Sequence, residues 1–223
     1  DPGLTHKEDL SSGTISAAFG GVTAILDMPN TKPPTSDLST LNMKKEIASS
    51  KAYVDYGFNV VALEDLTFEG VQNLVQDPAF GGFKVFMGET TGSLVMDNFV
   101  KLGEIFDSFQ GSNITFSLHA EDGELMSKLN IDSSGLLRSH LRSRMGAAES
   151  SAIDKALVAA GVNSSSLHFL HISSKEGVKA LKGKGATFEV TPHHLLLDVK
   201  NFYKDNEVEG YGKVNPPIRT SDD

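Results

Sequence analysis

The sequence predicts an α/β fold, and within that class a TIM-type (β/α)8 barrel rather than an open doubly wound sheet. Short apolar, β-branched runs alternate with longer segments of helical periodicity along the whole chain, as in βα units around a parallel sheet. Polar residues follow several different strands, which is where a barrel places its functional groups. Neither G-x-G-x-x-G nor G-x-x-x-x-G-K-[ST] occurs, although glycine-rich phosphate loops are typical of open doubly wound sheets.

The expected strands are short runs of mostly apolar residues, as in strands that are covered on both faces. They are residues 21–27, 57–63, 82–87, 113–119, 166–172 and 186–191. About six βα units are thus visible of the eight in a complete barrel, so the barrel is predicted to be incomplete.

The expected helices lie between these strands, at residues 39–50, 68–75, 96–109, 145–160 and 174–181. Gly183 and Gly185 follow the last of them, where helix stop signals are expected. The chain contains no linker, low-complexity tract or repeat of fixed period. We therefore expect residues 1–223 to form a single domain.

Composition excludes several classes of protein. The 223 residues include 20 basic and 29 acidic side chains, a formal net charge of −9, and no cysteine. Disulfides, thiolate metal sites and cysteine nucleophiles are excluded, so a metal would need histidine, carboxylate or modified lysine. An acidic chain without a basic stripe disfavours nucleic acid as a partner, and no run approaches the ~18 apolar residues of a membrane span. A small-molecule partner and a soluble, cytoplasmic protein are expected.

Three polar residues on the predicted strands are candidates for chemistry. His119 and His171 each end a predicted strand, where an imidazole can bind a metal or serve as a hydrogen-bonded structural residue. Lys84 lies among apolar neighbours, and burial lowers the pKa of a lysine amine. Lys84 could form a Schiff base or a carbamate that bridges metals, or could extend to a carboxylate such as that of Glu89.

Several other polar residues have both a functional and a structural interpretation. Asn30 lies in a proline-rich loop, where its amide could bind an amide or carboxylate substrate or form an Asx-turn. His193 and His194 are adjacent, so at most one faces the barrel mouth if strand geometry persists. His168 is interpreted as structural. The sequence disfavours a catalytic serine triad, because no G-x-S-x-G motif occurs.

Seven sequence blocks, in order along the chain, resemble the cyclic-amide hydrolases of the amidohydrolase superfamily, and most closely the dihydroorotase family. The blocks are DPGLTHKED (1–9), GGVT with DMPNT and PPT (20–35), GFKVFM (82–87), HAED (119–122), HISSKEG (171–177), EVTPHHL (189–195) and KVNPPIR (213–219). They run from the first residue almost to the last.

This resemblance implies a metal-dependent barrel that uses one or two zinc ions. His119 and His171 match metal ligands, and Lys84 occupies the position of the family's carboxylated lysine, which is an aspartate in some dihydroorotases. Asn30 and Asn215 match asparagines that contact the substrate. The implied activity is the reversible hydrolysis of dihydroorotate to N-carbamoyl-aspartate in pyrimidine biosynthesis, by metal-activated water.

The resemblance also predicts what this chain lacks. The family carries a His-x-His pair and an arginine just before the Asp-Pro-Gly block, and a general-base aspartate beyond the Asn-Pro-Pro-x-Arg block. We therefore expect a piece of a longer protein that lacks the first and last barrel strands, contains no catalytic base and has little or no activity by itself.

Alternatives remain open within and outside this activity. Allantoinases and hydantoinases (dihydropyrimidinases) share the barrel and the lysine, and a non-catalytic scaffold for a partner enzyme is also conceivable. Retention of Lys84, His119 and His171 speaks against a scaffold. The family further suggests a homodimer or an association with aspartate transcarbamoylase.

Overall fold

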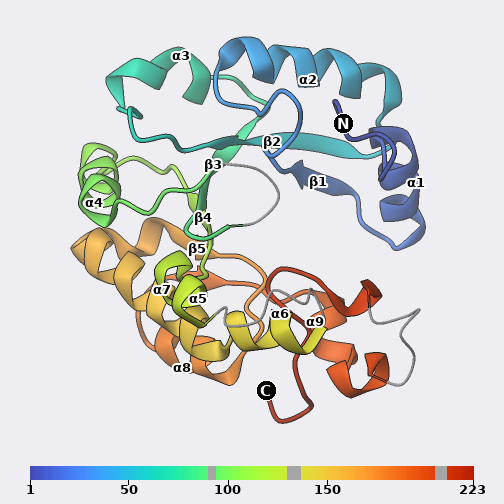
Figure 1. The fold of residues 1–223 in the computed structure, drawn as a ribbon. Helices are drawn as coiled ribbons and strands as arrows, with labels where there is room; N and C mark the ends of the chain where they lie inside the picture. The colour runs from blue at the N-terminus through green and yellow to red at the C-terminus, as the bar shows by residue number, and fades with distance from the viewer. Residues whose placement is uncertain (90–93, 130–136, 204–209) are drawn as a thin grey trace. The chain divides into compact units, whose positions relative to one another are not determined.

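The computed structural model of the chain describes residues 1–89, 94–129, 137–203 and 210–223 (Figure 1). The chain divides into two compact units. The first comprises Asp1–Val85 and Gly111–Phe116, and the second comprises Phe86–Gln110 and Ser117–Asp223. The expectation of one domain over residues 1–223 stays a prediction.

The strands follow one another in the hydrogen-bonded order β1-β2-β3-β4-β5-β6. The pairs with a defined register, β1–β2, β2–β3 and β5–β6, are parallel. Their bounds are Ala24–Asp27 (β1), Asp55–Val61 (β2), Phe80–Phe86 (β3), Phe116–His119 (β4), Leu167–Phe169 (β5) and Thr187–Phe188 (β6). All six predicted strands are present, and the alternation with helices confirms the predicted incomplete (β/α) barrel fold.

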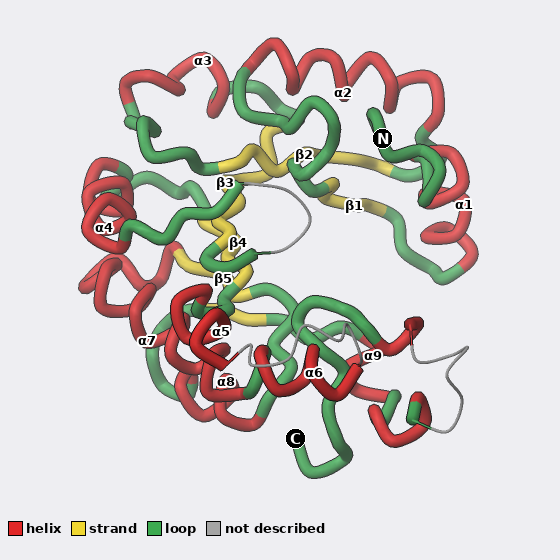
Figure 2. Tube along the Cα trace, in the orientation of Figure 1, coloured by secondary structure: helices red, strands yellow, loops and turns green. Residues whose placement is uncertain are grey.

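Helices α2 to α8 lie between successive strands along the chain, whereas α1 precedes β1 and α9 follows β6 (Figure 2). Their bounds are Leu10–Phe19 (α1), Leu38–Lys51 (α2), Gln72–Val75 (α3), Phe99–Ser108 (α4), Gly123–Leu129 (α5), Leu137–Ser143 (α6), Gly146–Ala160 (α7), Lys175–Leu181 (α8) and Pro192–Leu196 (α9). Short 3₁₀ turns cover Glu69–Val71 (η1), Gly161–Ser166 (η2), Val199–Phe202 (η3) and Gly210–Gly212 (η4). Every predicted helix is present, whereas α1, α5, α6 and α9 were missed.

In the first unit, α2 packs against both β2 and α1. Each of these helices begins at an aspartate whose side chain accepts a hydrogen bond from the backbone N–H three residues on, Asp9 for α1 and Asp37 for α2. Such caps satisfy an N–H that has no partner within the helix. Gly82 has a φ of 136°, and a Cβ there would lie 2.8 Å from the Thr115 carbonyl oxygen. Glycine therefore permits this close backbone approach.

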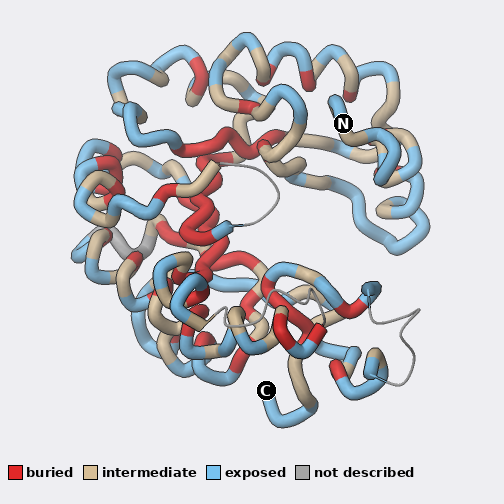
Figure 3. The backbone as a smooth tube through the Cα atoms, in the orientation of Figure 1, coloured by how far each residue is buried: buried red, intermediate tan, exposed pale blue. Residues whose placement is uncertain are grey.

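In the second unit, α7 packs against α4 and α8. The core is formed by fully buried apolar side chains, among them Leu102, Leu118, Ile153 and Phe169. Figure 3 shows that buried residues concentrate along the strands from β2 to β5. None of the helices in the described ranges has both the length and the apolar character needed to cross a membrane.

Candidate functional site

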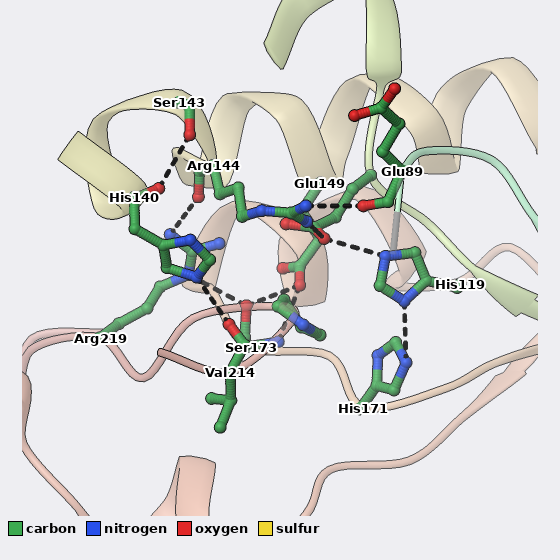
Figure 4. A network of polar contacts seen from close by, with 12 residues as sticks. Glu89, His119, His140, Ser143, Arg144, Glu149, His171, Ser173, Val214 and Arg219 are labelled. Carbon is green, nitrogen blue, oxygen red and sulfur yellow. Dashed lines mark hydrogen bonds and ion pairs between the residues drawn. The ribbon is translucent and has the colours of Figure 1, made fainter. Parts of the chain in front are cut away.

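Two predicted site residues, His119 and His171, meet in the second unit (Figure 4). His119 is the last residue of β4 and is only 2% exposed. Its Nδ1 lies 3.1 Å from Nε2 of His171, and the two rings are nearly perpendicular, at 73°. The structure thus brings together two histidines that are 52 positions apart in the sequence.

His171 has an unusual backbone conformation. Its φ is 42°, the only positive value found for a non-glycine residue within the described part of the chain. This left-handed region costs roughly 1–3 kcal/mol for such a residue and is retained where surrounding contacts enforce it, often at functional sites. The predicted strand to residue 172 was therefore too long, because β5 ends at Phe169 and His171 belongs to the turn that follows.

Glu121 and Arg144 determine which nitrogen of His119 carries a proton. His119 Nε2 lies 2.9 Å from Glu121 Oε2, and the Arg144 guanidinium contacts the same oxygen. Because arginine can only donate, this oxygen accepts from both groups, and His119 Nε2–H is the donor. The Nδ1 of the neutral His119 ring therefore accepts the hydrogen bond, and His171 Nε2–H donates it.

The Glu121 carboxyl is almost completely enclosed. Burial raises its pKa, while the positive charges of Arg144 and Arg219 oppose that rise. Arg144 also donates to the Glu89 carbonyl oxygen, at 2.6 Å, and its own carbonyl oxygen accepts from Arg219, at 2.9 Å. Glu121, the hydrogen-bond partner of His119 Nε2, is thus fixed by a network of arginines that sequence reasoning missed.

The histidine pair fits a metal in spacing and in its supporting contacts. Two imidazole nitrogens that share a tetrahedral zinc at 2.0–2.1 Å lie about 3.3 Å apart, close to the observed 3.1 Å. A ligating histidine usually donates its other N–H to a carboxylate, as His119 does to Glu121. Among the described residues, no group of three or more His, Asp or Glu side chains is arranged to hold a metal. The pair would therefore need further ligands.

Asn215 is exposed, and histidines hold the carbonyl groups on either side of it. His140 Nε2 lies 2.9 Å from the Val214 oxygen, and His194 Nε2 lies 3.0 Å from the Pro216 oxygen. A carbonyl oxygen can only accept, so both Nε2 atoms carry protons. Desolvation lowers the pKa of each histidine, which favours the neutral ring. These two histidines position the segment that carries Asn215.

The assumption of strand geometry at His193 and His194 was wrong. Both lie in α9, which begins directly after Thr191 with Pro192 in its first turn. His194 therefore approaches the Pro216 carbonyl from a helix. His168, interpreted as structural, lies on β5 with Nδ1 2.8 Å from the Thr187 hydroxyl of β6, which agrees with that interpretation.

Lys84 and Asn30 belong to the first unit. Lys84 lies on β3 as predicted, with 2% exposure, and its carbonyl oxygen accepts from the Ala62 N–H at 2.9 Å. Asn30 is half-buried in the loop after β1. Lys44, which sequence reasoning missed, holds the start of that loop, because its buried amine contacts the Asp27 carboxylate at 2.6 Å and the Met28 carbonyl oxygen at 2.8 Å. Desolvation lowers the pKa of Lys44, and the charge of Asp27 opposes this.

A cavity of about 630 Å³ in the second unit adjoins Arg144. The charged groups on its wall are this arginine and the carboxylates of Glu89, Asp97, Asp122 and Glu124. Four carboxylates against one guanidinium disfavour an anionic ligand there.

Comparisons with known proteins agree with the sequence resemblance. No family model matches the chain. A dihydroorotase from Pyrococcus abyssi is 37% identical over an alignment of 224 positions that covers 98% of this chain and 47% of that protein. A dihydroorotase from Methanosarcina acetivorans is 32% identical over 99% of this chain and 49% of its own length. The chain thus spans about half the length of the curated relatives it matches.

Solved structures share the fold. An L-hydantoinase (dihydropyrimidinase) from Arthrobacter aurescens has a TM-score of 0.82 at 25% identity, over 96% of this chain and 49% of that one. A D-hydantoinase from a Bacillus species has a TM-score of 0.80 at 26% identity, over 95% and 49%. The resemblance to the cyclic-amide hydrolases, and to dihydroorotases in particular, is confirmed over nearly the whole chain.

Proposed function

We propose that this chain forms part of the active site of a dihydroorotase, which hydrolyses the cyclic amide of dihydroorotate reversibly to N-carbamoyl-aspartate in pyrimidine biosynthesis. The observation that carries the proposal is the His119–His171 pair, 3.1 Å apart and supported by Glu121 and Arg144. The identity of up to 37% with dihydroorotases over 98% of the chain favours this substrate.

We assign a zinc site to His119 Nδ1 and His171 Nε2, where a bound zinc would replace the proton that His171 Nε2 donates in the metal-free pair. From the resemblance to dihydroorotases, Lys84 is proposed as a further metal ligand in the form of a carbamate, because carboxylation would replace a costly buried ammonium with an anion that suits a metal. Bound zinc would lower the pKa of a water molecule and polarise the scissile carbonyl. The Glu121 carboxylate keeps the His119 proton on Nε2, so that Nδ1 remains available as a ligand.

Asn30 and Asn215 are proposed to contact the substrate. An amide side chain supplies both a donor and an acceptor, which suits a ring that carries N–H and carbonyl groups. The general base is proposed to be an aspartate outside these 223 residues. The chain alone is therefore expected to show little or no turnover.

The test is zinc-dependent ring opening by a protein that contains this chain and the flanking segments found in its relatives. Dihydroorotate should be consumed, and Lys84→Ala should abolish activity, with partial rescue by a short carboxylic acid that replaces the carbamate. Failure with dihydroorotate would refute the substrate assignment. Unchanged turnover by Lys84→Ala would remove Lys84 from the metal site.

A hydantoinase or dihydropyrimidinase is the second candidate, because the solved neighbours carry those names. Their identity of 25–26% is lower than that of the dihydroorotases. Turnover of a hydantoin, dihydropyrimidine or allantoin without turnover of dihydroorotate would favour this group. Absence of metal binding and of all these activities would favour a non-catalytic scaffold.

The setting of the reaction is also part of the proposal. A cysteine-free chain suits a reducing cytoplasm. A homodimer, or a complex with aspartate transcarbamoylase, is proposed by analogy with the family. Sedimentation of the protein with and without the transcarbamoylase tests both assemblies.

A further inference from the structure

A buried carboxylate lies behind the turn that carries His171. Glu149 is on α7 and is 2% exposed. Its Oε1 accepts from the Ser173 N–H at 2.9 Å and from the Ser173 hydroxyl at 2.8 Å. Its Oε2 accepts from the Ser174 N–H at 2.9 Å and from the Ser174 hydroxyl at 2.5 Å. One side chain thus binds two consecutive residues through four hydrogen bonds.

The two serine hydroxyls extend this contact in different directions. Each donates its single proton to Glu149 and accepts a second hydrogen bond through a lone pair. The Ser173 hydroxyl accepts from Arg219 Nε at 3.0 Å, and the Ser174 hydroxyl accepts from the Gly177 N–H at 3.0 Å, as the N-cap of α8. A Cβ at Gly177 would collide with Glu149 Oε2, so the carboxylate packs directly against the first turn of α8.

This contact lies two residues after the strained backbone of His171. The strain must be offset by contacts that hold neighbouring residues. On one side of the turn, the Ile172 N–H donates to the Glu189 carbonyl oxygen at 2.9 Å. Beyond it, Glu149 fixes both Ser173 and Ser174. No direct contact between Glu149 and the His171 ring is needed for this effect.

We propose that Glu149 is a positioning residue: through Ser173 and Ser174 it holds His171 in the left-handed conformation that directs Nε2 at His119 Nδ1. The inference rests on the proposed function only where it treats the histidine pair as a metal site. The four hydrogen bonds of Glu149 go to Ser173 and Ser174, so its proposed action on His171 is indirect.

The variant Glu149→Gln tests this with little change in volume. Glutamine keeps one acceptor oxygen but turns its NH2 group toward the backbone N–H of one serine. Two hydrogen-bond donors then face each other there, and that hydrogen bond is lost. Asp154→Asn is the matched control, because it removes the same charge from an exposed position on the same helix. Both variants are made in the 223-residue chain.

The first readout needs no metal. Nuclear Overhauser contacts between the His119 and His171 rings are measured, together with hydrogen exchange of the Ser173 and Ser174 amides and the far-UV circular dichroism. The inter-ring contacts are expected to disappear in Glu149→Gln and to persist in Asp154→Asn, with both variants still folded. Inter-ring contacts retained in a folded Glu149→Gln would overturn the proposal, because its role would then be to stabilise α8 alone.

The second readout is the zinc dissociation constant, measured by competition with a chelator. Loss of a residue that orients a metal ligand typically weakens affinity 10–100-fold, and we expect a loss of that order for Glu149→Gln and none for Asp154→Asn. A loss below threefold would contradict the positioning role. If the unsubstituted chain binds no zinc, the proposed metal site fails, and the inter-ring contacts still decide the role of Glu149.

Ser173→Ala serves if Glu149→Gln does not fold. It removes one of the four donors and the acceptor for Arg219 while leaving the carboxylate and both backbone N–H groups in place. Weakened inter-ring contacts would support the proposal, and contacts equal to those of the unsubstituted chain would overturn it.

Discussion

Replacement of Arg144 by methionine should destabilise the second unit strongly. The guanidinium is the cationic partner of Glu121, whose side chain is 1% exposed, and it also donates to the Glu89 carbonyl oxygen. Methionine keeps the apolar stem but leaves the carboxylate buried without its charge partner. Removing one member of a buried pair costs about 3–5 kcal/mol, which corresponds to a roughly 10²–10³·⁵-fold shift toward the unfolded state.

Urea unfolding followed by circular dichroism measures this cost. Arg142→Met is the matched control, because Arg142 is exposed on α6, and its free energy of unfolding should change by less than about 0.5 kcal/mol. The double variant Arg144→Met/Glu121→Gln should recover much of the loss, since no charge is then left uncompensated. An Arg144→Met variant as stable as the control would refute the argument that this ion pair neutralises Glu121.

Three further predictions concern separate parts of the chain. Phe169→Ala removes a fully buried ring from β5 and should cost about 3–5 kcal/mol in thermal or urea unfolding; a loss below 1 kcal/mol would contradict tight packing there. Asp37→Ala should cost about 1 kcal/mol by uncapping α2. Hydrogen bonds from Thr40 lower the pKa of Asp37. The stabilisation that the Asp37 carboxylate gives to the folded state is therefore complete above the unfolded-state pKa and is lost as pH falls through the lower folded-state pKa. A cost of Asp37→Ala that does not change with pH in acid titration would contradict this. His140→Phe leaves the Val214 carbonyl without its donor and should cost about 1–3 kcal/mol, with faster local hydrogen exchange; unchanged exchange would show that His140 does not hold this segment.

Strands β2 to β5 could be predicted from sequence because they are largely buried and therefore read as apolar runs. Strands β1 and β6 are partly or fully exposed, and they were found by their apolar and β-branched residues. The ends of the strands could not be predicted. The expected strand through residue 172 contains only β-compatible residues, yet β5 ends at Phe169. The residues that follow His171 are held by Glu149, which bonds Ser173 and Ser174 from 24 and 25 positions earlier in the sequence. No local sequence pattern reports such a contact.

The helix α9 was missed although its start signal is present. Proline is favoured in the first turn of a helix, and Pro192 stands there after Thr191. The preceding run of β-branched and apolar residues was interpreted as a strand that continues to residue 191. Only Thr187 and Phe188 form β6. The helix-start signal at Pro192 was therefore more reliable than the β-branched run before it.

Some residues of the candidate site could be predicted from the sequence and others could not. His119 and Lys84 could be found because a polar residue in an apolar strand stands out, and both are buried on the predicted strands. Arg144 and Arg219 could not be found, because a long basic side chain in a polar segment is indistinguishable from an ordinary surface residue. Their roles depend on partners 23 and 46 positions away, Glu121 and Ser173.

These two arginines explain how separate segments of the second unit adopt consistent positions. Arg144 links the Glu121 carboxylate to the Glu89 carbonyl oxygen. Arg219 links the Arg144 carbonyl oxygen to the Ser173 hydroxyl. Ser173 is in turn held by Glu149. A displacement of any one segment therefore breaks hydrogen bonds to charged groups in another, each worth about 1.5–3 kcal/mol. Because the penalty is shared, the orientation of His119 and that of His171 are set together, which a site assembled from independent loops could not achieve.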